Sequence, residues 1–94
     1  MRATELLSIL SIDFKYKAIS KIKIEVKDQF YSIESVVKQQ EELIFIASET
    51  NDHSIEIKEL VTTLMLNKSQ KLIKFKDKFE PIYGCRVVQD TLVL

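Results

Sequence analysis

Side chains that could carry out acid–base or metal chemistry are few in this chain. His53 is the only histidine, and it lies in a polar stretch beside Asp52 and Glu49. A metal site needs three or four converging ligands, and the sequence offers neither a second histidine nor a pair of cysteines. We therefore interpret His53 as a solvated linker residue, and we expect neither a metal ion nor a cofactor.

Nucleophiles and carboxylates give no firmer indication of catalysis. The sequence contains no glycine-rich phosphate loop, no Ser-His-Asp order and no H-E-x-x-H motif. Cys85 would need a positioned base, and it matches the apolar Val36 in the internal comparison below, so a small buried side chain is favoured. Glu5 and Glu59 also match each other and could form a carboxylate pair. Acids in the first turn of a helix stabilise its dipole, which is the favoured explanation, and we expect no enzyme.

Lysines are concentrated in two segments of the chain. Residues 15–27 contain five lysines against one acid, and residues 68–78 contain five against one. The candidate surface for an anionic partner consists of Lys15, Lys17, Lys21, Lys23, Lys27, Lys68, Lys71, Lys74, Lys76 and Lys78. An acidic protein face, a nucleic acid or a nucleotide would suit such a surface. Solvated strand faces and protection of strand edges by lysine are the favoured alternative.

Size and composition limit the class of protein. The 94 residues predict one domain over residues 1–94. Fourteen Lys and Arg balance fourteen Asp and Glu, which weakens the case for a protein that coats DNA and tolerates self-association. One cysteine excludes an intrachain disulfide, and no apolar run reaches the ~18 residues of a membrane span. We expect a cytoplasmic protein with no membrane contact.

An internal similarity organises the elements that would position these residues. An offset of 49 aligns residues 23–45 with residues 72–94 without a gap. The identical pairs are Ile24/Ile73, Lys27/Lys76, Asp28/Asp77, Phe30/Phe79, Ile33/Ile82, Gln40/Gln89 and Leu43/Leu92. Upstream, an offset of 54 aligns "ATELLSIL" (3–10) with "IKELVTTL" (57–64). Two blocks in the same order predict a tandem repeat, with repeat one at 1–47, a linker at 48–54 and repeat two at 55–94.

Each predicted repeat begins with a helix and continues with three strands. Leu6 and Leu10, like Leu60 and Leu64, have the spacing of one apolar helical stripe. Apolar and charged residues then alternate over 21–27, as in a strand with one wet face. Asp28-Gln29 and Asp77-Lys78 interrupt the pattern and predict hairpin turns. The run "ELIFIA" (42–47) predicts a strand buried on both faces, and "TLVL" (91–94) is its counterpart.

The return strands carry a further irregularity. Inward positions step by three residues between Ile33 and Val36, and again between Ile82 and Cys85, which predicts a β-bulge. Gly84 lies inside the second step, where we expect a positive φ. The predicted fold is α+β: two tandem α-β-β-β repeats, antiparallel sheets covered by helices, and pseudo-twofold symmetry. The apolar C-terminal strand is a predicted edge, through which a homodimer could form.

The stretch "MRATELLSIL…IKIEVKDQFYSIESVVKQQEELIFIA" resembles a type of small, mostly uncharacterised protein common in bacteriophages and prophages. These proteins look like a T-V-K-E-L-I-x-x-L helix, a charged strand, a Pro-Ile-x-x-Val strand and an apolar strand. "IKELVTTL" and "EPIYGCRVV" match the form as well. Ile12-Asp13-Phe14 stands where the usual Asp-Pro-Asp would follow the helix. The resemblance implies a mobile-element context and carries over no functional residues.

Two functions are compatible with these patterns. The first is a non-enzymatic protein of phage or prophage origin that binds a host protein and could inhibit a defence system, as an anti-CRISPR does. Small size, absent catalytic motifs and the resemblance support it. The alternative is binding of nucleic acid or an anionic nucleotide by the two lysine-rich segments, whose contacts would be strongest at low salt.

Overall fold

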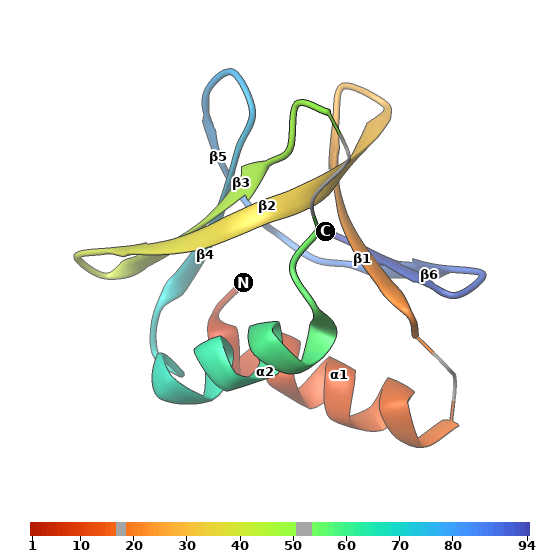
Figure 1. Ribbon diagram of the computed structural model, residues 1–94. Helices are drawn as coiled ribbons and strands as arrows, with labels where there is room; N and C mark the ends of the chain where they lie inside the picture. The colour runs from red at the N-terminus through yellow and green to blue at the C-terminus, as the bar shows by residue number, and fades with distance from the viewer. Residues whose placement is uncertain (17–18, 51–53) are drawn as a thin grey trace.

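The computed structural model describes residues 1–16, 19–50 and 54–94, with side chains omitted at residues 12–16. Along these ranges the elements are α1 (Ala3–Tyr16), β1 (Lys21–Val26), β2 (Gln29–Gln39), β3 (Glu42–Ala47), α2 (Ile57–Leu66), β4 (Lys71–Phe75), β5 (Phe79–Pro81), β6 (Arg86–Val88) and β7 (Thr91–Val93). The strands form one curled sheet, and both helices lie side by side below it (Figure 1). The α+β class is confirmed, whereas one mixed sheet replaces the antiparallel sheets that we expected.

The sheet has the strand order β5-β4-β3-β2-β1-β7-β6. Four neighbouring pairs are antiparallel, and two, β3 with β4 and β1 with β7, are parallel. The C-terminal strand β7 therefore has a partner on each side. The prediction that "TLVL" is an edge is wrong, because its residues pair with β1 as well as with β6. A homodimer through that edge loses its structural basis.

The core lies between the helices and the inner face of the sheet. Leu6 and Leu10 of α1 and Leu60 and Leu64 of α2 are buried, as their helical spacing predicts. They join a cluster that includes Phe45 from β3. A fully buried side chain of this kind contributes roughly 1.5–3 kcal/mol, so this layer fixes the helices to the sheet.

Tight turns in this chain use residues other than glycine. Lys27 and Asp28, between β1 and β2, have φ values of 52° and 66°, and two positive values in succession suit a two-residue hairpin. Gln40 and Gln89 begin the turns before β3 and β7 with φ values of 55° and 56°. Gly84 has no positive φ, so our expectation for it is wrong.

The predicted bulge is present in β2. Its pairing with β3 shifts register between Ile33 and Ser35. The corresponding segment near the C-terminus is divided into two strands, β5 and β6, with residues 82–85 between them. Ile82 in that connection is buried in the core, so the chain crosses the inner face of the sheet there.

Candidate functional site

The lysines predicted to bind an anionic partner lie on separated strands. Lys21 and Lys23 are on β1, and Lys71 and Lys74 are on β4, with β2 and β3 between the two strands in the sheet. Lys27 lies in the turn after β1, and Lys68 lies between α2 and β4. Lys15 lies in the part of α1 without described side chains, and Lys17 lies outside the described residues, as does His53.

Lys74 has a structural role in the described part of the chain. It pairs in register with Phe45 of the core, so its side chain starts on the inner side of β4. Its Nζ donates hydrogen bonds to the carbonyl oxygens of Glu25 at 2.6 Å and Leu94 at 3.5 Å. These bonds connect β4 to β1 and to the C-terminus across the mouth of the curled sheet, so the ammonium is not presented to a partner.

Lys76 and Lys78 also have partners. Both carboxylate oxygens of Glu49 accept hydrogen bonds from the Lys76 Nζ at 2.9 Å, and that atom lies 5.3 Å from the centre of the Tyr31 ring. The hydrogen bond to Glu49 raises the pKa of Lys76, against an opposing effect of desolvation. Lys78 lies 3.7 Å from a Glu80 oxygen. Lysines that are paired with acids attract anions less strongly. Binding of nucleic acid by this surface stays a prediction, and fewer unpaired positive charges support it.

The remaining reactive candidates lie on separate elements of the described chain. Glu5 accepts a hydrogen bond from the backbone N–H of Arg2 at 3.0 Å, which satisfies one free donor at the start of α1. Glu59 is an acid in the first turn of α2, on the other helix. Cys85 is half-buried against the core rather than fully buried. Among the described residues, no group of three His, Cys, Asp or Glu side chains could hold a metal ion.

A different surface has the composition of a binding site. Alternation along β3 places Leu43, Phe45 and Ala47 in the core and turns Ile44 and Ile46 to the opposite side of the sheet. There Ile44 pairs in register with Val37 of β2 and with Ile73 of β4. The next row joins Ile46 to Phe75 of β4 and Phe79 of β5. We call this surface the outer apolar face, and its residues are Val37, Ile44, Ile46, Ile73, Phe75, Phe79 and Pro81.

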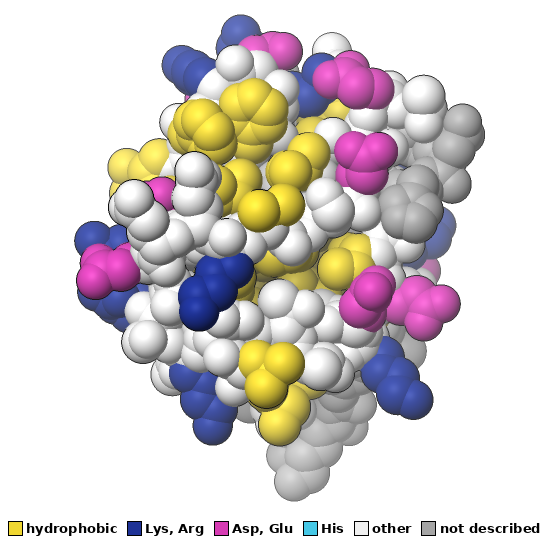
Figure 2. All heavy atoms as spheres, turned by 60° about the vertical axis from the view of Figure 1, so that its left-hand side comes forward, with side chains coloured by type: hydrophobic (Ala, Val, Ile, Leu, Met, Phe, Trp, Pro, Cys, Tyr) yellow, Lys and Arg dark blue, Asp and Glu magenta, His cyan; other side chains and the backbone are white. Residues whose placement is uncertain are grey.

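Apolar side chains on this face are exposed at its two sides, on β2 and β5, whereas Ile44 and Ile73 between them are buried. Phe79 is 63% exposed and Val37 43% exposed, and the Phe75 and Phe79 rings are 4.6 Å apart. Tyr83, 86% exposed, lies outside this face, in the connection between β5 and β6. The view that brings β4 and β5 forward shows hydrophobic side chains gathered over this half of the molecule (Figure 2). The aromatic composition is that of protein interfaces.

The other half of the sheet carries charged residues on its outer side. In one half of the sheet, strand pairing joins Val37, Ile44, Ile73 and Pro81 in one row. In the other half, the pairing of β6, β7, β1 and β2 joins a corresponding row of Arg86, Val93, Lys23 and Ser32. Here Arg86 Nη1 donates to Glu25 Oε1 at 2.7 Å. This hydrogen bond lowers the pKa of the Glu25 carboxyl. Arg86, Lys23 and Glu25 thus place charged groups on the outer side of this half, around the buried Val93.

The outer apolar face was not predicted from the sequence, although part of its signal is present there. The continuous run "ELIFIA" predicts apolar side chains on both faces of β3, and Ile44 is 5% exposed although it lies outside the core cluster. The run itself does not show which residues lie beside the second apolar face of β3. The neighbouring strands β2 and β4 are brought to β3 only by the fold.

Comparisons with family models, with curated proteins and with solved structures return no match for this chain. None of the helices in the described ranges is long and apolar enough to cross a membrane.

Proposed function

We propose that this chain is a non-enzymatic protein-binding domain and that the outer apolar face is its binding surface. The observation that carries the proposal is the row at Val37, Ile44, Ile73 and Pro81, in which four paired strands present apolar side chains away from the core. The matching row in the other half of the sheet contains Arg86 and Lys23 beside the buried Val93 and Ser32. Neighbouring exposed apolar side chains are a marker of an interaction site.

The chemistry of the face defines the kind of partner. Phe79 and Val37 expose on the order of 200 Å² of side-chain surface, taking ~150–250 Å² for a whole aromatic side chain. A standard interface takes about 800 Å² from each partner, so a polar rim would supply the rest. The next row in register contains Gln39, Glu42 and Lys71, with one charge of each sign. The partner surface is therefore apolar at its centre and carries no strong net charge.

The resemblance to phage and prophage proteins supports a partner in a bacterial host. Binding would act by occupying a host protein, because no catalytic arrangement is required for inhibition of that kind. An inhibitor of a host defence nuclease, anti-CRISPR-like, is one form of this function.

The proposal includes the origin of the fold, in which two tandem units are related by a pseudo-twofold axis. The last strand of each unit pairs in parallel with the first strand of the other, β3 with β4 and β7 with β1. The aligned Gln40 and Gln89 have nearly the same positive φ. Both observations support a duplication, after which only one half of the outer surface acquired an apolar face.

Affinity capture with matched variants tests the binding proposal. The wild-type chain and the double variant Val37→Ser/Phe79→Ser are used as baits in bacterial lysate. Phe30→Ser/Leu66→Ser serves as the control, because both of its residues are exposed but lie outside the face. The expected result is one partner held by the wild type and the control and lost by the Val37/Phe79 variant. Loss of a central aromatic anchor costs about 2 kcal/mol or more, roughly a thirtyfold weaker affinity. Equal recovery by both variants would contradict the assignment of the face.

A further inference from the structure

The two helices form a groove on their outer side that is separate from the outer apolar face. It has a volume of about 700 Å³, and it is lined by Leu7, Ser8, Leu10, Ser11, Val61, Met65 and Lys68. Leu7 and Val61 are only partly buried, and Met65 is 57% exposed. The groove is thus an open apolar channel between α1 and α2.

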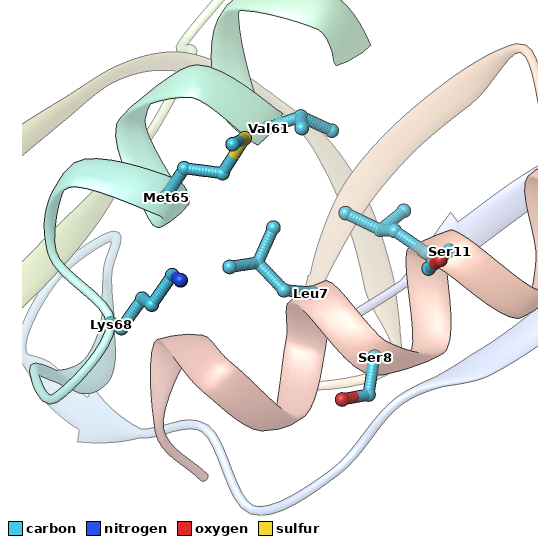
Figure 3. A pocket seen from close by; sticks show the side chains of 7 residues that line it. Leu7, Ser8, Ser11, Val61, Met65 and Lys68 are labelled. Carbon is cyan, nitrogen blue, oxygen red and sulfur yellow. The ribbon is translucent and has the colours of Figure 1, made fainter.

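One end of the groove carries a positive charge. The backbone N–H of Thr4 donates to the Lys68 carbonyl at 3.0 Å, which fixes the segment after α2 beside the start of α1. From there the Lys68 side chain extends toward Leu7, with Met65 and Val61 on the α2 side, whereas Ser8 points away (Figure 3). No acidic residue lines the groove. Within the described ranges, no carboxylate forms an ion pair with Lys68.

From this arrangement we infer that the groove binds a small amphiphile with one alkyl chain and a carboxylate head, with the head at Lys68. Small-molecule sites have volumes of about 300–1,000 Å³ and apolar walls with a few placed polar groups, and this groove has both properties. The single cation at one end of the groove pairs with the carboxylate head and so sets the direction of the ligand's alkyl chain. Met65 has a flexible, polarisable side chain that adapts to an alkyl group.

The length of the walls argues against a partner helix as the occupant. A docked helix uses anchors at i, i+4 and i+7, which span about 10 Å. Among the described side chains of α1, the apolar wall comprises Leu7 and Leu10, which lie within one turn, about 5 Å of rise. An alkyl chain that runs from Lys68 toward Ser11 fits this shorter wall.

An NMR titration of the full chain with sodium octanoate tests the inference, with 1-octanol and octylammonium as controls of the same chain length. Octanoate is expected to shift the methyl signals of Leu7, Leu10, Val61 and Met65 and to bind more tightly than octanol, with octylammonium weakest. Decanoate should bind up to roughly fifteenfold more tightly than octanoate, because each fully buried methylene contributes about fourfold. Methyl shifts confined to other surfaces, or equal affinity for octylammonium and octanoate, would overturn the inference.

Two variants separate the charge from the apolar walls. Lys68→Gln should weaken octanoate about two- to fivefold, the range of one exposed ion pair, and leave octanol unchanged. Met65→Gln should weaken both ligands, whereas Leu66→Gln, at an exposed neighbour that does not line the groove, should weaken neither. A Lys68→Gln variant that retains full octanoate affinity would refute the role of the ammonium. Phe79→Ser should bind octanoate as the wild type does, so the groove is tested independently of the outer apolar face.

Discussion

Replacing Gln40 by glycine should stabilise this protein, and replacing its one glycine by alanine should stabilise it as well. Gln40 and Gln89 begin turns with φ values of 55° and 56°, in the left-handed region that disfavours residues with a Cβ. Both side chains are exposed, so a glycine there loses little contact. Gly84 has no positive φ, and a Cβ built on it meets no atom within 4 Å.

The magnitude follows from two opposing contributions. A left-handed conformation costs a non-glycine residue about 1–2 kcal/mol. Glycine loses more conformational entropy on folding, which offsets roughly 0.5–1 kcal/mol of that gain. We expect Gln40→Gly and Gln89→Gly each to raise the free energy of unfolding by about 0.5–1 kcal/mol, or ~2–8 °C in Tm. Gly84→Ala should add about 0.4–1 kcal/mol by restricting the unfolded chain.

Urea denaturation followed by circular dichroism measures these differences as shifts in the transition midpoint at constant m-value. Gln39→Gly is the matched control, because this exposed residue is the last of β2 and has no positive φ. It should lower stability by roughly 0.5–1 kcal/mol, as glycine does inside a strand. A loss of stability in Gln40→Gly equal to that in Gln39→Gly would refute the reasoning, since the backbone conformation would then have no part in the effect.

Two further predictions concern polar contacts. Lys74→Met keeps the length of the side chain but removes the donor to the Glu25 and Leu94 carbonyls, so thermal unfolding should show a loss of stability of about 1–3 kcal/mol. The same change at exposed Lys71 should alter stability by no more than ~0.5 kcal/mol. Equal effects at the two positions would contradict the bridging role of Lys74. The Ser20 hydroxyl donates to Asp90 at 2.6 Å and lowers the pKa of that carboxyl from its ordinary 3.8. A lowered carboxyl pKa contributes stability that is present above the ordinary value and is lost as pH falls through the lowered one. Urea unfolding should therefore show a deficit for Ser20→Ala at neutral pH that narrows below about pH 4, and a deficit that is independent of pH would rule this linkage out.

Periodicity predicted much of the local structure. The spacing of Leu6 with Leu10, and of Leu60 with Leu64, was sufficient for two helices, because an apolar stripe at 3.6-residue spacing has few alternatives. The third strand was expected at 42–47, which is β3. The bulge after Ile33 is also confirmed, since the step between inward positions is a property of one strand.

The register of β4 was not available from the same patterns. The 49-residue offset pairs Ile24 with Ile73, yet Ile24 lies in the core and Ile73 on the outer apolar face. On β4, the side chains of Leu72 and Lys74 face inward instead. In "KLIKF" two adjacent apolar residues allow either face to point inward, and a slip of one residue exchanges the faces. The register adopted turns Lys74 inward, where it bonds to the Glu25 and Leu94 carbonyls, and turns Ile73 to the outer apolar face.

The sequence by itself determined which segments become helices and strands, because backbone periodicity and turn residues are local properties of the chain. The sequence also lacks a glycine-rich phosphate loop, a Ser-His-Asp order and an H-E-x-x-H motif. Tertiary structure decided that β7 is flanked on both sides, that three of the eight candidate-surface lysines with described side chains have partners, and that the strands with outward apolar residues are neighbours. These features depend on pairing between segments far apart in the chain, and pairing is fixed by the burial of the whole core.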